Sequence, residues 1–263
     1  MAQLAQLTRA VLERTRSGIV GGPHRCCICS SQVSRFLPYR GGHRSAITRE
    51  LDVVGSDVVN FSCPVCGSTD RERHLFLYLD HTDIWTKMRD AVVLHIAPER
   101  HLRARIEELP TKLYLTADIE VKTTHSVAFD MRSAPFASNS VDILIANHVL
   151  EHVIDLEGSL AEAARILKPG ALAVLQTPYT PKLESTLQLD AIRTAESREL
   201  LYGQHDHVRL FGSDIFATIE RSGFTNQSIQ HSELCNADAT ILGVNPKEPF
   251  FLFGKRVSAP DNG

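Results

Sequence analysis

The sequence lacks any apolar run that approaches the roughly 18 residues needed to cross a bilayer as a helix. Its first residues also lack the apolar core of a secretory signal peptide. We therefore expect a cytoplasmic protein without a membrane partner. With 263 residues, 43% of them hydrophobic, the chain is long enough for one domain of ordinary size and a small additional module.

Acidic residues are scarce near the N-terminus. Residues 1–50 contain eight arginines against only Glu13 and Glu50, so this segment carries +6, whereas the whole chain carries −3 and the remainder therefore −9. Two interpretations remain open. The arginines form the solvated surface of a small module, or they form a basic face for an acidic partner such as nucleic acid.

Cysteine is also uncommon, but five of the six cysteines form two clusters, Cys26-Cys27-Ile28-Cys29 and Cys63-Pro64-Val65-Cys66. Each cluster contains a Cys-x-x-Cys pair, and two such pairs supply the four tetrahedral thiolates that a structural zinc prefers. We expect Zn²⁺ bound by Cys26, Cys29, Cys63 and Cys66, with Cys27 as the alternative to Cys26. Four protein ligands leave no open position, so this metal is expected to be structural.

Other roles for the cysteines are weaker. Disulfides are uncommon in the cytosol, and neither pair follows a strand as a thioredoxin-like redox motif does. Cys235 stands alone and is expected to be a buried apolar residue. Leucines and valine at helical spacing predict a helix within residues 1–22, which packs on the main domain or binds a partner.

Beyond the cysteine module, apolar runs alternate with amphipathic segments. This alternation predicts a doubly wound α/β sheet. A helix is expected after the candidate N-caps in 68–70 and another over 99–108. Strands are expected over 91–97, 112–119, 126–130, 141–146 and 171–176.

Polar residues gather where the strand at 141–146 stops, namely Asn147, His148, Glu151 and His152. A helical segment, the turn Lys168-Pro169-Gly170 and a further apolar run follow. In an open α/β sheet the ligand crevice lies at the carboxyl ends of the strands. The sequence therefore predicts a site at this end of the sheet.

Residues 141–178 closely resemble the second half of class I S-adenosylmethionine-dependent methyltransferases, and the resemblance extends over about residues 91–256. It implies a Rossmann-like, mostly parallel seven-stranded sheet whose last strand is reversed. The corresponding edge pair is expected near 226–231 and 249–254. The expected organisation is an N-terminal helix, a zinc knuckle or ribbon, the methyltransferase domain and a tail, over 1–22, 23–69, 70–257 and 258–263.

The resemblance also implies a cofactor site for S-adenosylmethionine. Asp118, followed by Ile119, ends the second strand and is placed to accept hydrogen bonds from the ribose hydroxyls. Asp130 and Met131 at the end of the third strand match the residues that meet the adenine. Asn147 and His148 are expected near the methionine moiety.

The first loop departs from the family pattern. The usual acidic residue and Gly-x-Gly are replaced by a segment without glycine, in which His95, Ala97 and Glu99 are the candidate contacts. Ala97 is the nearest small substitute, and Glu99 is expected to meet the methionine amino group. The chain is similar to a subgroup with a His-x-Ala-Pro-Glu loop and a Gly-Gln-x-Asp-His-Val-Arg segment.

That second segment, residues 203–209, supplies the substrate-side candidates His205 and His207. Together with His148 they are candidate general bases toward an acceptor. In the rival interpretation His207 and Arg209 anchor the loop by hydrogen bonds. Metal binding by the two histidines lacks a third ligand in the sequence pattern.

The resemblance and the residues together predict methyl transfer to a small-molecule or natural-product acceptor. Two alternatives remain. One is an RNA methyltransferase that binds RNA through its basic zinc module. The other is a binding protein that is stabilised by zinc and has no catalytic activity. No Asn-Pro-Pro-Tyr type motif follows the fourth strand, which disfavours adenine-type base methylation.

Overall fold

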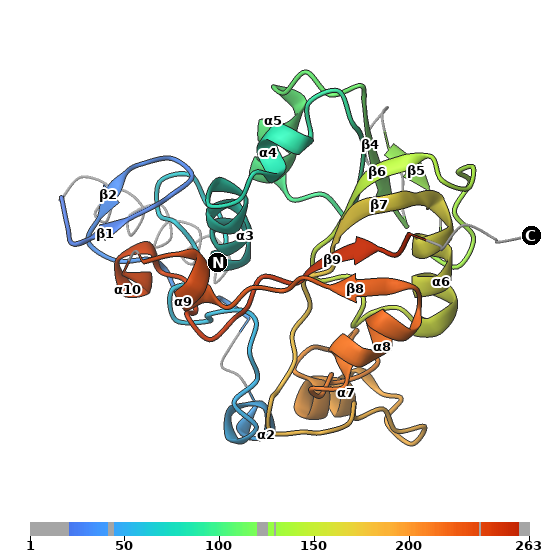
Figure 1. Ribbon diagram of the computed structural model, residues 1–263. Helices are drawn as coiled ribbons and strands as arrows, with labels where there is room; N and C mark the ends of the chain where they lie inside the picture. The colour runs from blue at the N-terminus through green and yellow to red at the C-terminus, as the bar shows by residue number, and fades with distance from the viewer. Residues whose placement is uncertain (1–20, 42–44, 120–125, 129, 237, 258–263) are drawn as a thin grey trace, which may run out of the picture. The chain divides into compact units, whose positions relative to one another are not determined.

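The computed structural model describes residues 21–41, 45–119, 126–128, 130–236 and 238–257 (Figure 1). The chain divides into two compact units. The first comprises the described residues of 1–44 with Gly55–Thr82 and Gln230–Glu248, and the second comprises Ser45–Val54, Asp83–Ile229 and the segment from Pro249 onward. Residues 1–20 of the expected N-terminal helix and the tail 258–263 lie outside the described residues.

The second unit contains a seven-stranded sheet with the order β5-β4-β3-β6-β7-β9-β8. Its strands are β3 (Val92–Ile96), β4 (Leu113–Asp118), β5 (Ser126–Ala128), β6 (Val141–Ala146), β7 (Leu167–Val174), β8 (Phe224–Asn226) and β9 (Leu252–Lys255). The first five are parallel, and β9 runs antiparallel to both β7 and β8. The predicted doubly wound sheet with one reversed strand is confirmed.

The strands form where the sequence is apolar without alternation, because a parallel sheet is covered on both faces. Leu94, Leu144, Ala173 and Phe253 are completely buried in one continuous core. The prediction was wrong in detail at β7, which begins at Leu167 and not after the turn at 168–170. Pairing shifts between Val141 and Ile143, so the residues of this turn bulge out of the strand, with Gly170 at φ +77°.

Two of the longer helices of the second unit begin at residues whose side chains satisfy free backbone amides. Asp155 caps α6 (Leu156–Ile166) through the amide of Gly158, and Thr194 forms a capping box at α7 (Ala195–Tyr202). Figure 1 shows α6 and α8 (Ile215–Arg221) against the sheet, where they contact β7 and β8. The other helices are α2 (Ala46–Glu50), α4 (Ile84–Lys87) and α5 (Arg100–Glu107).

The first unit contains a two-stranded antiparallel sheet, β1 (His24–Arg25) and β2 (Gln32–Val33), with α3 (Asp70–Asp80), α9 (His231–Leu234) and α10 (Ala239–Leu242). Arg73, completely buried, donates hydrogen bonds to the carbonyls of Ser68, Leu242 and Gly243. This unit differs from the expected module 23–69, because α3 and residues 230–248 belong to it as well.

Among the described residues, no helix combines the length and apolar character required to cross a membrane.

Candidate functional site

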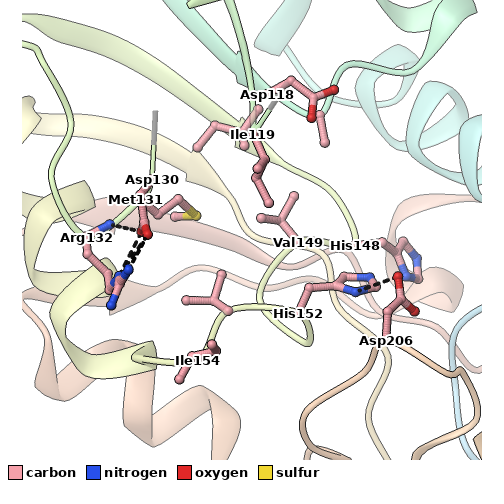
Figure 2. Close-up of a pocket in the computed structure, with 13 residues that line it drawn as sticks. Asp118, Ile119, Asp130, Met131, Arg132, His148, Val149, His152, Ile154 and Asp206 are labelled. Carbon is pink, nitrogen blue, oxygen red and sulfur yellow. Dashed lines mark hydrogen bonds and ion pairs between the residues drawn. The ribbon is translucent and has the colours of Figure 1, made fainter. Parts of the chain in front are cut away.

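The second unit has a cavity of about 800 Å³ at the carboxyl ends of β3, β4 and β6 (Figure 2). This volume is in the range of small-molecule and cofactor sites. Figure 2 shows Asp118, Asp130 and His152 at separate places around it. The lining residues are Ile96, Ala97, Asp118, Ile119, Asp130, Met131, Arg132, His148, Val149, His152, Val153, Ile154 and Asp206.

The loop after β3 reaches the cavity through Ala97. Its φ of +48° lies in the left-handed region that glycine adopts without strain and alanine does not. The amide of Ala97 donates a 2.7 Å hydrogen bond to the carbonyl of Ala117 in β4, which holds the loop in this conformation. The loop therefore keeps a glycine-like backbone although it has no glycine.

Three predicted cofactor contacts lie behind the cavity wall and do not line it, namely His95, Glu99 and Asn147. His95 is completely buried, with Nε2 2.9 Å from Oε2 of Glu99 and Nδ1 2.9 Å from the hydroxyl of Tyr114. Because a carboxylate only accepts, Nε2 of His95 donates to Glu99, and the hydroxyl of Tyr114 shares a hydrogen bond with Nδ1 of His95.

The other oxygen of Glu99 accepts from the side-chain amide of Asn147. Burial alone would raise the pKa of Glu99, but the hydrogen bonds from His95 and Asn147 and the charge of His95 lower it below its ordinary value. Both oxygens of Glu99 thus accept hydrogen bonds from protein side chains, and its predicted contact with the methionine amino group stays a prediction. The side-chain oxygen Oδ1 of Asn147 is buried and has no hydrogen-bond partner in the part of the chain that the structure describes.

The acidic residues predicted at the ends of the second and third strands both line the cavity. Asp118 is the last residue of β4, and Ile119 beside it is 85% exposed. Asp130 is paired with Arg132, whose Nε lies 3.0 and 2.9 Å from the two carboxylate oxygens. This hydrogen bonding lowers the pKa of Asp130.

Histidines gather around Glu151 beside the cavity. Nδ1 of His148, Nε2 of His152 and Nε2 of His207 lie 3.2, 4.0 and 3.9 Å from Oε1 of Glu151. Burial would raise the pKa of Glu151, but the hydrogen bond from His148 and the charges of the three histidines lower it to about 2. Burial lowers the pKa of His207.

The predicted general bases are in different positions. His148 lines the cavity and has a left-handed φ of +55°, a strained conformation that concentrates at functional sites. His207 is buried and does not line the cavity, and its Nδ1 donates to the carbonyl of Tyr202 at 3.0 Å. His205 is exposed and lies outside the cavity lining.

Arg209, which is 2% exposed, makes the hydrogen bonds expected if the segment 203–209 is anchored to the rest of the domain. Its guanidinium donates to the carbonyls of Leu150, Val153 and Ile154 at 2.9, 2.5 and 3.0 Å. It also donates to Oε1 of Gln188. Arg209 therefore fixes the segment that forms one wall of the cavity.

Sequence reasoning missed several lining residues. Arg132 and Asp206 stand next to predicted site residues, and this adjacency was the available signal for both. The apolar residues Val149, Val153 and Ile154 gave no signal, because an apolar residue after a strand equally begins a helix.

In the first unit, the sulfurs of Cys26, Cys29, Cys63 and Cys66 all lie within 4.8 Å of one another. The Cys26–Cys66 and Cys29–Cys63 separations are 3.8 and 3.9 Å. Tetrahedral Zn²⁺ with bonds of ~2.3 Å requires separations of about 3.8 Å, so the four thiols fit this ion. Cys27 instead donates to the carbonyl of Arg73, and burial raises the pKa of its thiol to about 12.

The strand order, the reversed strand and the cavity at the carboxyl ends define the sheet architecture that the resemblance to class I methyltransferases implied. Residues 72–175 match a family model described as a methyltransferase domain. The matched segment is less than half of the chain but contains every cavity-lining residue except Asp206. Residues 72–175 are therefore similar to a methyltransferase domain over most of the cavity lining.

Comparison with curated proteins gives no significant match. Among solved structures, the chain is similar to one from a complex between the Trm112 methyltransferase activator of Haloferax volcanii and a methyltransferase. The two chains are 16% identical, and the match covers 71% of this chain and 92% of that chain with a TM-score of 0.45. YcgJ of Bacillus subtilis is 15% identical, and the match covers 70% of this chain and 100% of that chain with a TM-score of 0.45. An S-adenosylmethionine-dependent methyltransferase of Mesorhizobium loti is 17% identical, and the match covers 67% of this chain and 98% of that chain with a TM-score of 0.45. No substrate or partner carries over at this level of similarity.

Proposed function

We propose that this protein is an S-adenosylmethionine-dependent methyltransferase that acts on a small-molecule acceptor in the cavity of the second unit. One observation carries the proposal. Asp118, the last residue of β4, lines the same cavity as Ala97 of the glycine-like first loop. A carboxylate at this position can accept hydrogen bonds from both hydroxyls of a ribose.

The other lining residues suit the remaining parts of the cofactor. Ile119, Met131 and Val149 offer an apolar surface for the adenine, and Asp130 places a carboxylate at the edge of that surface. S-adenosylmethionine supplies an already activated methyl group, so the protein has mainly to align the acceptor and exclude water. On the acceptor side His148 is the general-base candidate of the cavity wall.

We further propose that the four-cysteine cluster holds a structural Zn²⁺. The sulfur separations and the all-thiolate ligand set support this ion. Cys26 is the proposed ligand of the adjacent pair, since Cys27 points to the carbonyl of Arg73. Four sulfur ligands leave no open position, so the metal would stabilise the first unit and take no part in methyl transfer.

The test is calorimetric titration of the zinc-replete protein with S-adenosylhomocysteine. We expect micromolar binding by the wild type and at least a tenfold loss in Asp118→Ala, about 1.4 kcal/mol or more. Asp190→Ala removes an exposed carboxylate that does not line the cavity and is the matched control. Absence of binding by well-folded wild-type protein, or equal binding by Asp118→Ala, would contradict the proposal and favour a binding protein without catalysis.

The acceptor class needs a separate measurement because residues 1–50 carry a net +6. Binding of a mixed-sequence RNA is measured at low and at high salt. A small-molecule enzyme is expected to show no retention at physiological salt. Tight retention that falls steeply with salt would identify RNA as the acceptor, since phosphate contacts release counterions.

A further inference from the structure

The carboxylate of Glu151 is surrounded by imidazoles in an arrangement that the proposed methyl transfer does not require. Glu151 is 1% exposed, and its Oε2 accepts a 3.0 Å hydrogen bond from the hydroxyl of Thr177. Its Oε1 faces Nδ1 of His148 and the Nε2 atoms of His152 and His207. Three nitrogen atoms from separate side chains thus converge on one oxygen atom.

The second nitrogen of two of these histidines is held by an acceptor. Nδ1 of His207 lies 3.0 Å from the carbonyl of Tyr202, and a carbonyl can only accept, so the proton of neutral His207 resides on Nδ1. Nδ1 of His152 lies 3.3 Å from a carboxylate oxygen of Asp206, which imposes the same tautomer. In the neutral imidazoles both Nε2 atoms therefore present lone pairs to Glu151.

When the imidazoles are neutral, these lone pairs repel the carboxylate oxygen, and a cation between the groups removes this repulsion. Nε2 of His207 is buried and has no hydrogen-bond partner among the described residues, and the His207 side chain is only 8% exposed. A histidine whose far nitrogen is fixed by a carbonyl or a carboxylate, with its near nitrogen free, is the usual arrangement at a protein metal centre.

We propose that Glu151, His152 and His207 bind a divalent first-row transition metal ion in the wall of the cavity. The three donor atoms lie within 4.8 Å of one another. Bonds of about 2.1 Å require separations of about 3.4 Å in a tetrahedral site, so the 3.9 and 4.0 Å distances to Glu151 need to shorten by roughly half an ångström. Two imidazoles and a carboxylate favour Fe²⁺, Co²⁺ or Zn²⁺ over Mg²⁺ or Ca²⁺.

The site differs from the cysteine cluster in ligand type and in openness. Three protein ligands leave positions for further donors. His148, His152 and Asp206 also line the cavity. An acceptor hydroxyl is the class of ligand expected on the cavity side, an expectation that rests on the proposed function.

The test uses Co²⁺ alone, added without cofactor to protein whose cysteine cluster is already loaded with Zn²⁺. We expect about one equivalent to bind with visible d–d bands and without the near-ultraviolet sulfur-to-cobalt charge-transfer band, because the ligands are nitrogen and oxygen. Glu151→Gln and His207→Asn should each weaken Co²⁺ binding at least tenfold. The asparagine retains a donor for the carbonyl of Tyr202 and so preserves the fold.

His205→Asn, an exposed histidine of the same loop, is the matched control and should bind Co²⁺ as the wild type does. The proposal is overturned if folded wild-type protein binds no Co²⁺ outside the cysteines, or if both variants bind it unchanged. Circular dichroism and thermal melts of each variant verify folding. Because the titration contains no cofactor, its failure is independent of failure to bind S-adenosylhomocysteine.

Discussion

The guanidinium of Arg209 donates a 2.9 Å hydrogen bond to the carbonyl of Leu150, across 59 positions of the sequence. The same group reaches the carbonyls of Val153 and Ile154, so one buried side chain holds the whole turn that follows β6. This turn carries His152, Val153 and Ile154 of the cavity wall. The cavity therefore depends on a residue that does not line it.

Arg209→Lys should lower both stability and ligand affinity. Lysine cannot reproduce the planar fork, so at least two buried carbonyls lose their donor, with an expected cost of about 2–4 kcal/mol. We expect several-fold weaker binding of S-adenosylhomocysteine, measured by calorimetry, and a lower unfolding midpoint in urea. Arg193→Lys, at an exposed arginine, should leave both unchanged, and an unaltered midpoint in Arg209→Lys would contradict the anchoring role.

Ala97→Gly should be neutral or stabilising. Releasing alanine from φ +48° removes about 1–2 kcal/mol of strain, and the greater freedom of glycine in the unfolded chain costs about 0.4–1 kcal/mol. The free energy of unfolding in urea should therefore rise by up to ~1.6 kcal/mol. Ala97→Val, with a branched side chain in the same conformation, should lose about 2 kcal/mol or more. A clear loss in the glycine variant would show that the strain argument fails.

Asp70 should make the stability of the protein depend on pH. Burial raises its pKa to about 7, although it accepts a hydrogen bond from the amide of Asp57, and one of its oxygens has no partner. The unfolded chain releases the proton near pH 4, whereas the folded chain retains it until about pH 7. The stabilising contribution is thus complete below about pH 4 and is lost as the pH rises through about 7.

Asp70→Asn removes this titration, so the wild type should lose on the order of 1–3 kcal/mol between about pH 5 and pH 8 relative to the variant. Urea unfolding across this pH range measures the difference. Asp80→Asn, at the exposed other end of α3, should keep the wild-type slope. Parallel curves for wild type and Asp70→Asn would mean that Asp70 is already ionised in the folded protein.

Removal of the proposed zinc should destabilise the first unit. Cys63→Ser should lose about one equivalent of zinc per chain and lower the melting temperature by more than about 5 °C, because metal binding is coupled to folding. Cys27→Ser retains a donor for the carbonyl of Arg73 and should keep both the zinc and the melting temperature. Elemental analysis and thermal melts give the two readouts. Zinc-free wild-type protein, or zinc loss in Cys27→Ser, would refute the assignment.

Local sequence patterns were sufficient for the sheet and its edge. Continuous apolar runs identified β3, β4 and β6 within one or two residues, because a strand covered on both faces has few polar positions. The antiparallel pair at the edge of the sheet was also expected, although its reversed strand, β9, begins three residues later than predicted. The turn at Gly170 was correctly located, but the register shift that absorbs it into β7 depends on pairing with β6.

The site residues likewise divide into those that local sequence patterns predict and those that depend on tertiary contacts. Asp118 and Asp130 could be placed at the cavity because each follows a strand, and parallel strands end at one edge of the sheet. The position of Glu99 outside the cavity lining could not be predicted from the sequence. It depends on hydrogen bonds with His95 in β3 and with Asn147, which follows β6. The choice of Cys26 over Cys27 depends likewise on which thiol faces the second pair and which faces Arg73.

The sequence by itself determined the order of strands and helices, the two Cys-x-x-Cys turns and the acidic residues at strand ends, because each depends on side chains a few positions apart. Only the tertiary structure decided that residues 230–248 join the cysteine-containing unit, and that His207 lies 3.9 Å from Glu151. These relationships join positions far apart in the chain, and no local periodicity encodes which buried polar groups will meet.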